Sequence, residues 1–363
     1  MRQESKLKLE CMAIGSLPHC CVEDAMDLVK SCFTNIPFWP QLAKVSKNED
    51  MIYQFLENMP AFWADEENAK SYMDSEYDDF CTDLEQFFLD YEEITSDINS
   101  DLLEKYGISQ KNSAAFPYFI DLVKTTKPAF AKGQIVGPFT LATTLVDKNG
   151  RCVYYDEALR EIVVKTLTLK ALWQIKQIKA SSHKTTPIIF IDEPSISQLG
   201  TSAYITITQE EVIEILKEIS DLIQSTGAMS AIHCCGKCDW TVPVKAGVNI
   251  INLDAYGFAQ NLSVFYKSIS QFLNKGGKIA WGVVPTLDKT ALEKADTGLI
   301  LSKFDAAVNY LTKKGIDEKL IIDNSIITPS CGAGALSKEL AQKAMELTKN
   351  VSDSLKEKYK IDC

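Results

Sequence analysis

The features that would place the chain at a membrane or on a nucleic acid are missing from its sequence. A membrane-spanning helix needs about 20 consecutive apolar residues, and no run of that length occurs. Residues 1–10 also lack the apolar core of a secretory signal. The net charge of −11 opposes binding to phosphate backbones, which requires basic patches. We therefore expect a cytoplasmic protein that contacts neither a membrane nor a nucleic acid.

The sequence also lacks the cysteine pattern of a secreted, disulfide-linked protein. It holds 11 cysteines, an odd number, in 363 residues. Disulfide frameworks are typical of short secreted chains with paired cysteines. We expect reduced thiols, a few of them metal ligands. No linker, low-complexity tract or internal repeat divides the chain, so we predict one domain over residues 1–363.

The acidity of the chain is local. Residues 65–104 contain 15 acidic residues and one lysine, a net charge of −14, and the difference from −11 leaves +3 for the rest. Apolar and aromatic residues between Tyr77 and Tyr91 recur at three- and four-residue steps, which predicts an amphipathic helix. We predict that residues 63–114 form an acidic helical insertion. Its charges are either a solvated face or a docking surface for another protein.

Eight apolar stretches that could form strands alternate with helical patterns. They are residues 10–16, 35–42, 129–138, 187–191, 228–232, 248–254, 277–285 and 325–332. Continuous apolar strands separated by helices are typical of a parallel sheet covered on both faces. We predict an α/β protein made of a single (β/α)₈ TIM barrel, with the acidic insertion after the second strand. A doubly wound open sheet is the alternative.

Helix signals between these stretches are clear in two places. Residues 155–180 have the pattern of a long helix. Thr208 and Glu211 form a capping box, and a helical stripe of apolar residues follows it as far as Gly227.

Residues able to carry chemistry stand where the predicted strands end. In a barrel of this type, functional residues gather at the carboxyl ends of the strands. The residues found there are Ser16, Asp192, Glu193, His233, Cys235, Asp254 and Cys331. We expect them to share one rim of the barrel.

His233, Cys235 and Cys331 have the chemistry of a zinc site. Side chains alternate along a strand, so His233 and Cys235 should point to one side and Cys234 to the other. One imidazole and two thiolates suit Zn²⁺, and three protein ligands leave one coordination position open. A thiol bound there would be deprotonated and become a strong nucleophile. Asp254 could fill that position at rest or hold a substrate amine.

Three other interpretations of these motifs stay open. Cys235 and Cys238 could form a redox pair or half of a zinc knuckle. The cysteines after residue 232 could also be small apolar residues of a buried strand. Gly332 and Gly334 could cradle a phosphate, or could provide a turn that frees Cys331.

Four motifs in this order resemble a known family. They are Ile14-Gly15-Ser16-Leu17-Pro18, Asp192-Glu193-Pro194, His233-Cys234-Cys235 and Ser330-Cys331-Gly332. Together they resemble the C-terminal catalytic barrel of cobalamin-independent methionine synthase and the related zinc and corrinoid methyltransferases of the uroporphyrinogen decarboxylase/methionine synthase-like superfamily.

The resemblance implies roles for these residues. It implies that Ile14, Gly15 and Ser16 hold the homocysteine carboxylate, that Asp192 in the Asp192-Glu193 pair binds its amine, and that His233, Cys235 and Cys331 bind Zn²⁺. Asp254 stands where the family has a glutamate that can ligate zinc. Asp192 and Asp254 are accordingly predicted catalytic residues, and Ile14, Gly15, Ser16, Asp192 and Glu193 are predicted to bind substrate.

The sequence departs from the family in two respects. Residues 38–41, Phe-Trp-Pro-Gln, stand in place of the family's His-Gly-Glu, and 363 residues leave room for one barrel only. Both departures favour a methylated corrinoid protein over a folate as methyl donor. We therefore predict a zinc-dependent methyltransferase that activates a thiol, expected to be homocysteine. The alternatives are a methylcobalamin:coenzyme M type methyltransferase, a metal-free decarboxylase of the same fold, and a non-catalytic zinc- or thiol-binding protein.

Overall fold

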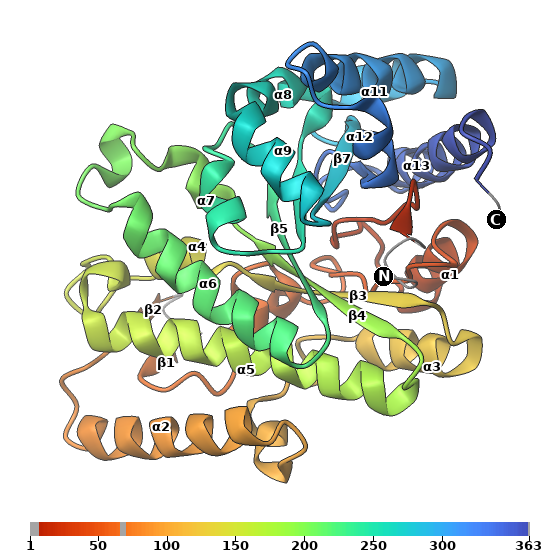
Figure 1. Ribbon diagram of the computed structural model, residues 1–363. Helices are drawn as coiled ribbons and strands as arrows, with labels where there is room; N and C mark the ends of the chain where they lie inside the picture. The colour runs from red at the N-terminus through yellow and green to blue at the C-terminus, as the bar shows by residue number, and fades with distance from the viewer. Residues whose placement is uncertain (1–6, 66–69, 362–363) are drawn as a thin grey trace.

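A curled parallel sheet surrounded by helices forms the centre of the protein (Figure 1). The structure is a computed structural model and describes residues 7–65 and 70–361. Six strands are hydrogen-bonded in chain order, from β3 to β8. They are β3 (Phe130–Val136), β4 (Thr186–Asp192), β5 (Met229–Cys234), β6 (Ile250–Leu253), β7 (Lys278–Val284) and β8 (Ser325–Pro329). The predicted mixed α/β architecture is confirmed, as are its last six strands.

The first two predicted strands meet the rest of the sheet through isolated bridges and not through continuous ladders. Isolated parallel bridges join Cys11 to Ile327 of β8, Ser16 to Gln41, and Phe38 to Lys132 of β3. Pro37 and Pro40 have no N–H group to donate, which interrupts hydrogen bonding in the second segment. The predicted ladder of eight strands is thus found for six, and the structure shows a six-stranded half-barrel with two bridged segments at its edges.

Helices cover the outer face of the sheet. The helices before β5 are α1 (Val22–Cys32), α2 (Phe80–Ser96), α3 (Phe116–Thr126), α4 (Pro138–Thr144), α5 (Glu157–Ser181) and α6 (Gln209–Ser225). Those after it are α7 (Thr241–Lys245), α8 (Ala255–Leu262), α9 (Tyr266–Asn274), α10 (Lys289–Lys294), α11 (Thr297–Thr312), α12 (Glu318–Asp323) and α13 (Lys338–Lys358). The predicted capping box is present, because Thr208 and Glu211 bond reciprocally at the start of α6.

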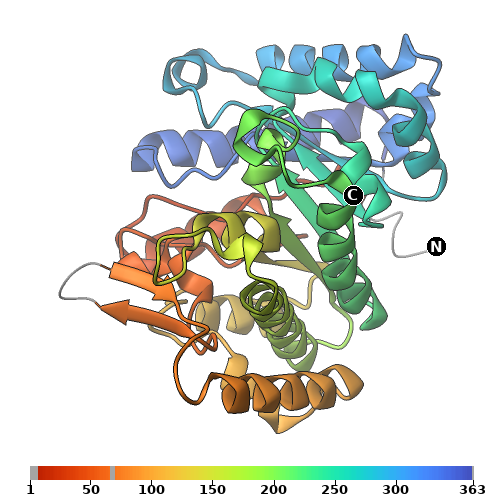
Figure 2. The same ribbon diagram turned by 90° about the vertical axis from the view of Figure 1, so that its left-hand side faces the viewer.

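The acidic segment contains more than the predicted helix. The helix is α2, but a hairpin of β1 (Phe62–Asp65) and β2 (Lys70–Met73) precedes it. Figure 2 shows this hairpin projecting from the body, with α2 lying apart from the sheet. Lys170 of α5 donates to the carbonyls of Glu57 and Gly107, which lie on either side of the acidic stretch 65–104. The hairpin makes the segment a mixed one rather than an all-helical one.

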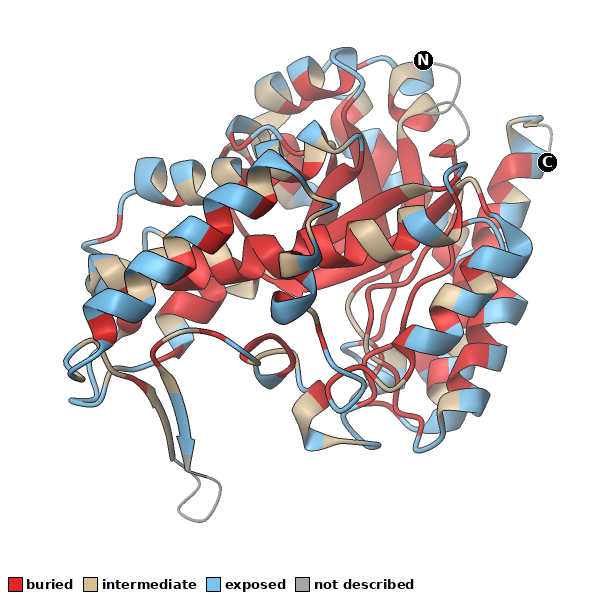
Figure 3. Cartoon of the chain, turned by 90° about the horizontal axis from the view of Figure 1, so that it is seen from below, coloured by how far each residue is buried: buried red, intermediate tan, exposed pale blue. Residues whose placement is uncertain are grey.

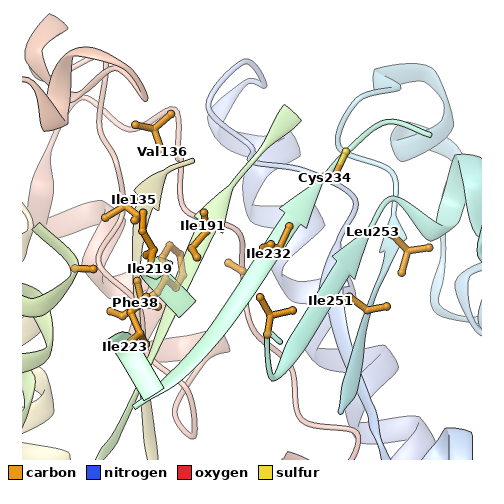
Figure 4. Close-up of a cluster of buried hydrophobic side chains, with 14 of the residues drawn as sticks. Phe38, Ile135, Val136, Ile191, Ile219, Ile223, Ile232, Cys234, Ile251 and Leu253 are labelled. Atoms are coloured by element: carbon orange, nitrogen blue, oxygen red, sulfur yellow. The ribbon is translucent and has the colours of Figure 1, made fainter. Parts of the chain in front are cut away.

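The strands of the central sheet are buried along their whole length, apart from Thr186 at the start of β4. All seven residues of β3 and of β7 are buried (Figure 3). One face of the sheet packs under the helices, and there Cys234 lies among apolar side chains with Ile232 and Leu253 (Figure 4). Because side chains alternate along a strand, His233 and Cys235 face the other way, as predicted.

The structure bears on two predictions, one about membrane-spanning helices and one about disulfide bonds. No helix within residues 7–65 and 70–361 is both long enough and apolar enough to cross a membrane. The ten described cysteines are free thiols. Cys363 lies outside the described residues.

Candidate metal centre

Three ligand-type side chains, all from the second half of the chain, meet at the carboxyl end of the sheet. One ring nitrogen of His233 and the sulfurs of Cys235 and Cys331 all lie within 4.8 Å of one another. His233 belongs to β5, Cys235 follows it directly, and Cys331 follows β8, with β6 and β7 between the two ligand-bearing strands. His233 is buried, whereas the two cysteines are half-buried. The structure therefore assembles the predicted ligand set.

A ring nitrogen of His233 is left without a hydrogen bond. Its Nδ1 atom lies 2.5 Å from Oδ1 of Asn252 on β6. Its Nε2 atom is buried and has no hydrogen-bond partner. A buried nitrogen without a partner is costly. A metal bound at Nε2 would satisfy it.

The contact between the two thiols shifts their pKa values in opposite directions. A hydrogen bond from Cys331 is the main factor that lowers the pKa of Cys235, and His233 lowers it further. The same contact, together with burial, raises the pKa of Cys331. Two soft sulfur donors and one neutral imidazole are a set that suits Zn²⁺. The donor chemistry and the unpartnered Nε2 both fit such an ion.

The backbone of Cys331 is held by Thr286, which follows β7. The Cys331 N–H donates to Thr286 Oγ1 over 2.9 Å, and Thr286 Oγ1 donates to the Cys331 carbonyl over 2.9 Å. The Thr286 N–H donates to Ser330 Oγ over 3.0 Å. These bonds fix the backbone of the residue that carries the third candidate ligand.

Asp192 is the last residue of β4 and lies beside His233 of β5. One oxygen of its carboxylate has no hydrogen-bond partner among the described residues. The two residues are register partners in the sheet. Asp192 is buried, and its Oδ1 atom accepts no hydrogen bond. Burial raises the pKa of Asp192, while His233 and Lys132 oppose that rise. A free carboxylate beside the cluster can receive a cationic group of a ligand.

Lys132 of β3 is a buried cation close to the same site. Its Nζ atom donates to the carbonyl of Ile14 and to Oε1 of Gln134, and lies 4.5 Å from the ring centre of Phe190. Burial lowers the pKa of Lys132 to about 8. Sequence reasoning missed this residue, although a lysine inside an otherwise apolar strand is a visible signal.

The Ile14-Gly15-Ser16 segment lies against the loop that carries Cys331. The Ser16 carbonyl accepts from Ala333 N–H, and Ser16 Oγ accepts from Gly334 N–H over 3.2 Å. A Cβ atom on Gly332 would come within 2.1 Å of Ser16 Oγ. The two glycines are therefore needed for close approach to Ser16, and this contact accounts for them without a phosphate.

Glu193, which was predicted to bind substrate, is hydrogen-bonded to the start of α4. Its two carboxylate oxygens accept from Phe139 N–H, Thr140 N–H and Thr140 Oγ1 at the start of α4. Burial raises the pKa of Glu193 to about 7, against the effect of these bonds. The structure gives Glu193 the task of anchoring α4 to the end of β4.

Asp254 caps a helix and is not part of the three-ligand cluster. Its Oδ1 atom accepts from Gly257 N–H at the start of α8. Burial raises the pKa of Asp254 to about 6, and the nearby Cys235 adds to this rise. Asp254 therefore lies close enough to the cluster to interact with it electrostatically.

Cys235 is brought together with Cys331 rather than with Cys238. Cys238 is buried among apolar residues. The local Cys235–Cys238 pair is thus replaced by a contact between residues almost a hundred positions apart. Sequence reasoning also missed Asn252 and Thr286, because ordinary polar residues give no signal until their partners are known.

Comparisons with known proteins do not identify the function, so the functional argument rests on the geometry of the site. No protein-family model matches the chain, and no curated protein matches it. A B12-independent methionine synthase from Shewanella sp. W3-18-1, solved with selenomethionine, is similar at 16% identity and a TM-score of 0.46, with 67% of each chain covered. The tandem GH20 modules of the pneumococcal exo-β-D-N-acetylglucosaminidase StrH are similar at 12% identity and a TM-score of 0.43, with 99% of this chain and 89% of that chain covered. Likenesses this distant assign neither family nor function.

Proposed function

We propose that the protein is a cytoplasmic, zinc-dependent S-methyltransferase, with homocysteine as the methyl acceptor. The observation that carries the proposal is the meeting of His233, Cys235 and Cys331 within 4.8 Å, with a buried Nε2 atom that has no hydrogen bond. In this proposal the two bridged N-terminal segments are the first two strands of a (β/α)₈ barrel.

His233 Nε2 and the sulfurs of Cys235 and Cys331 would hold Zn²⁺. When bound, the ion lowers the pKa of a thiol that reaches its open position, and so supplies a nucleophile at neutral pH. Three protein ligands are the arrangement of catalytic rather than structural zinc sites.

The other residues orient the acceptor. Asp192, whose Oδ1 has no partner, receives the ammonium group of homocysteine. Ser16 Oγ accepts from Gly334 N–H, so its own proton is free to be donated to the carboxylate. The acceptor sulfur then attacks the methyl carbon in line. The S–C bond forms as the bond from the methyl group to its donor breaks, and the donor keeps that electron pair.

A methylated corrinoid protein is the proposed methyl donor. Trp39 and Gln41 stand where the related enzymes have the His-Gly-Glu motif. Gln41 brings a neutral amide to Gly15, and its Nε2 donates to Oε1 of Gln54. A neutral amide thus stands where the related enzymes have a glutamate, and this departure argues against a folate as the donor.

Metal analysis combined with a transfer assay tests the proposal. Wild-type protein should contain one equivalent of zinc and convert homocysteine and free methylcobalamin into methionine. Cys235→Ala and Cys331→Ala should lose zinc and activity together, whereas Cys234→Ala, a change at an adjacent buried thiol, should keep both. Full zinc in either ligand variant would refute the ligand set. Preferential methylation of coenzyme M would favour the alternative acceptor.

A further inference from the structure

Each of the two strands that carry the candidate ligands is contacted by a polar residue of the neighbouring strand. Asn252 of β6 is the register partner of His233 of β5. Thr286 follows β7 and bonds to Cys331 beyond β8. Asn252 is fully buried and Thr286 is nearly so. Neither residue is a metal ligand, so their placement calls for another explanation.

The contacts of Asn252 determine which ring nitrogen of His233 carries the proton. Asn252 Nδ2 lies 2.8 Å from the carbonyl oxygen of Ala280, which can only accept. The NH₂ group of Asn252 therefore faces Ala280, and its carbonyl Oδ1 faces His233 Nδ1 over 2.5 Å. Because Oδ1 can only accept, Nδ1 must be the protonated nitrogen. The lone pair is then on Nε2, the nitrogen without a hydrogen bond.

Asn252 also connects the two ligand-bearing strands. Its Nδ2 atom donates to Thr328 Oγ1 over 2.8 Å. Thr328 lies on β8, three residues before Cys331. A continuous path of hydrogen bonds thus runs from the imidazole of His233 through Asn252 to the strand that presents the third ligand.

Thr286 holds the backbone of Cys331, the third candidate ligand. Its hydroxyl both accepts from the Cys331 N–H and donates to the Cys331 carbonyl. Valine has the same shape as threonine but can make neither bond. Serine retains the hydroxyl.

We infer that Asn252 and Thr286 are positioning residues that hold His233 and Cys331 in the metal-binding arrangement before the ion arrives. Asn252 selects the Nδ1-protonated form of His233, and Thr286 fixes the backbone of Cys331. This inference rests on the proposed zinc site. Removal of such outer partners is expected to lower metal affinity by about 10- to 100-fold.

The tautomer of His233 can be measured in the folded wild-type protein. The chain contains three histidines, so ¹⁵N-histidine labelling gives three imidazole spin systems, and a His233→Gln variant identifies one of them. In metal-free protein, at a pH where the ring is neutral, the spectrum should show a proton on Nδ1 and a lone pair on Nε2. A proton on Nε2 would overturn the assignment of Asn252.

Zinc affinity, measured by competition with a chelator, tests both positions. Asn252→Leu and Thr286→Val should each weaken zinc binding by about 10- to 100-fold, and Thr286→Ser should restore affinity to nearly the wild-type value. Thr348→Val is the matched control, because Thr348 is a buried threonine whose hydroxyl donates to the Ala344 carbonyl within α13. Thermal melts check that each variant is folded. If Asn252→Leu does not fold, the tautomer measurement on the wild-type protein decides the role of Asn252.

The outcomes separate this inference from the proposed function. If wild-type protein binds no zinc, the proposed function fails. If it binds zinc and Thr286→Val binds it equally well, the proposed site stands and the role of Thr286 is wrong. Cobalt substitution adds a second readout, since a displaced His233 or Cys331 would change the visible spectrum of the bound ion.

Discussion

Gly332 and Ser16 approach each other so closely that no side chain fits between them. A Cβ atom placed on Gly332 would lie 2.1 Å from Ser16 Oγ and 3.4 Å from Ser16 Cβ. Gly332 is adjacent to the candidate ligand Cys331, and Ser16 is the residue proposed to bind the acceptor carboxylate. The contact therefore joins the metal half of the site to the substrate half.

Gly332→Ala should disturb both halves. The added methyl group forces Ser16 Oγ away from Gly334 N–H or moves the loop that carries Cys331. Overpacking of this kind costs about 1–3 kcal/mol of unfolding free energy, and zinc affinity should fall in parallel. Urea unfolding and zinc titration measure the two effects. Gly298→Ala is the control, since a Cβ atom there meets only Asp296 Oδ1 at an ordinary 3.5 Å. Wild-type stability and zinc affinity in Gly332→Ala would contradict the prediction.

Asp192→Asn should separate stability from acceptor binding. The change removes a buried carboxylate whose Oδ1 has no hydrogen bond, so the unfolding free energy at neutral pH should rise by about 1 kcal/mol. The Michaelis constant for homocysteine should rise about tenfold or more, equivalent to about 1.4 kcal/mol of lost binding. Asp121→Asn, on the exposed side of α3, should change neither. An unchanged Michaelis constant would remove Asp192 from the acceptor site.

Lys132 should make stability increase in mildly alkaline solution. Burial lowers its pKa to about 8 in the folded protein, against an ordinary value of 10.5. Between these values the unfolded chain binds more protons than the folded one, so stability rises with pH. The cost of the buried charge is complete below pH 8 and disappears by about pH 10.5.

A comparison with Lys132→Met isolates this effect from other titrating groups. As pH increases from 8 to 10.5, the wild type should gain about 3 kcal/mol of unfolding free energy relative to Lys132→Met. Denaturant unfolding at a series of pH values measures the difference. A constant difference between the two proteins would mean that the pKa of Lys132 is not lowered.

Glu193→Gln distinguishes an anchoring role from a substrate-binding role. Both carboxylate oxygens of Glu193 accept hydrogen bonds at the start of α4. An amide offers one oxygen and one NH₂ group, so at least one donor of α4 loses its acceptor. The unfolding free energy should fall by about 1–3 kcal/mol, with zinc content unchanged. A raised Michaelis constant for homocysteine without loss of stability would instead support the original prediction for Glu193.

The part of the site that follows from strand periodicity was predictable. Alternation along β5 was enough to separate His233 and Cys235 from Cys234. The pairing of Cys235 with Cys331 followed from the rule that parallel strands end at one rim. The residues that hold the ligands were not predictable, because the importance of Asn252 and Thr286 depends on partners in other strands.

The errors in the fold have local physical causes. Pro37 and Pro40 interrupt hydrogen bonding in the second segment, so a stretch that looks like a strand makes only isolated bridges. The hairpin of β1 and β2 consists of two strands of four residues each, too short for an alternating pattern to stand out.

The pairing of Cys11 with Ile327 has a consequence for the order of folding. Leu9 N–H donates to the carbonyl of Ser325, and Ser352 Oγ donates to the carbonyl of Leu9, so the beginning of the sheet rests on its end. Contacts of such large sequence separation form slowly. A nascent chain cannot complete this edge before β8 is synthesised, and Cys331 is made later still. The cluster of His233, Cys235 and Cys331 is therefore among the last parts of the fold to assemble, because it needs β8 and the loop after it.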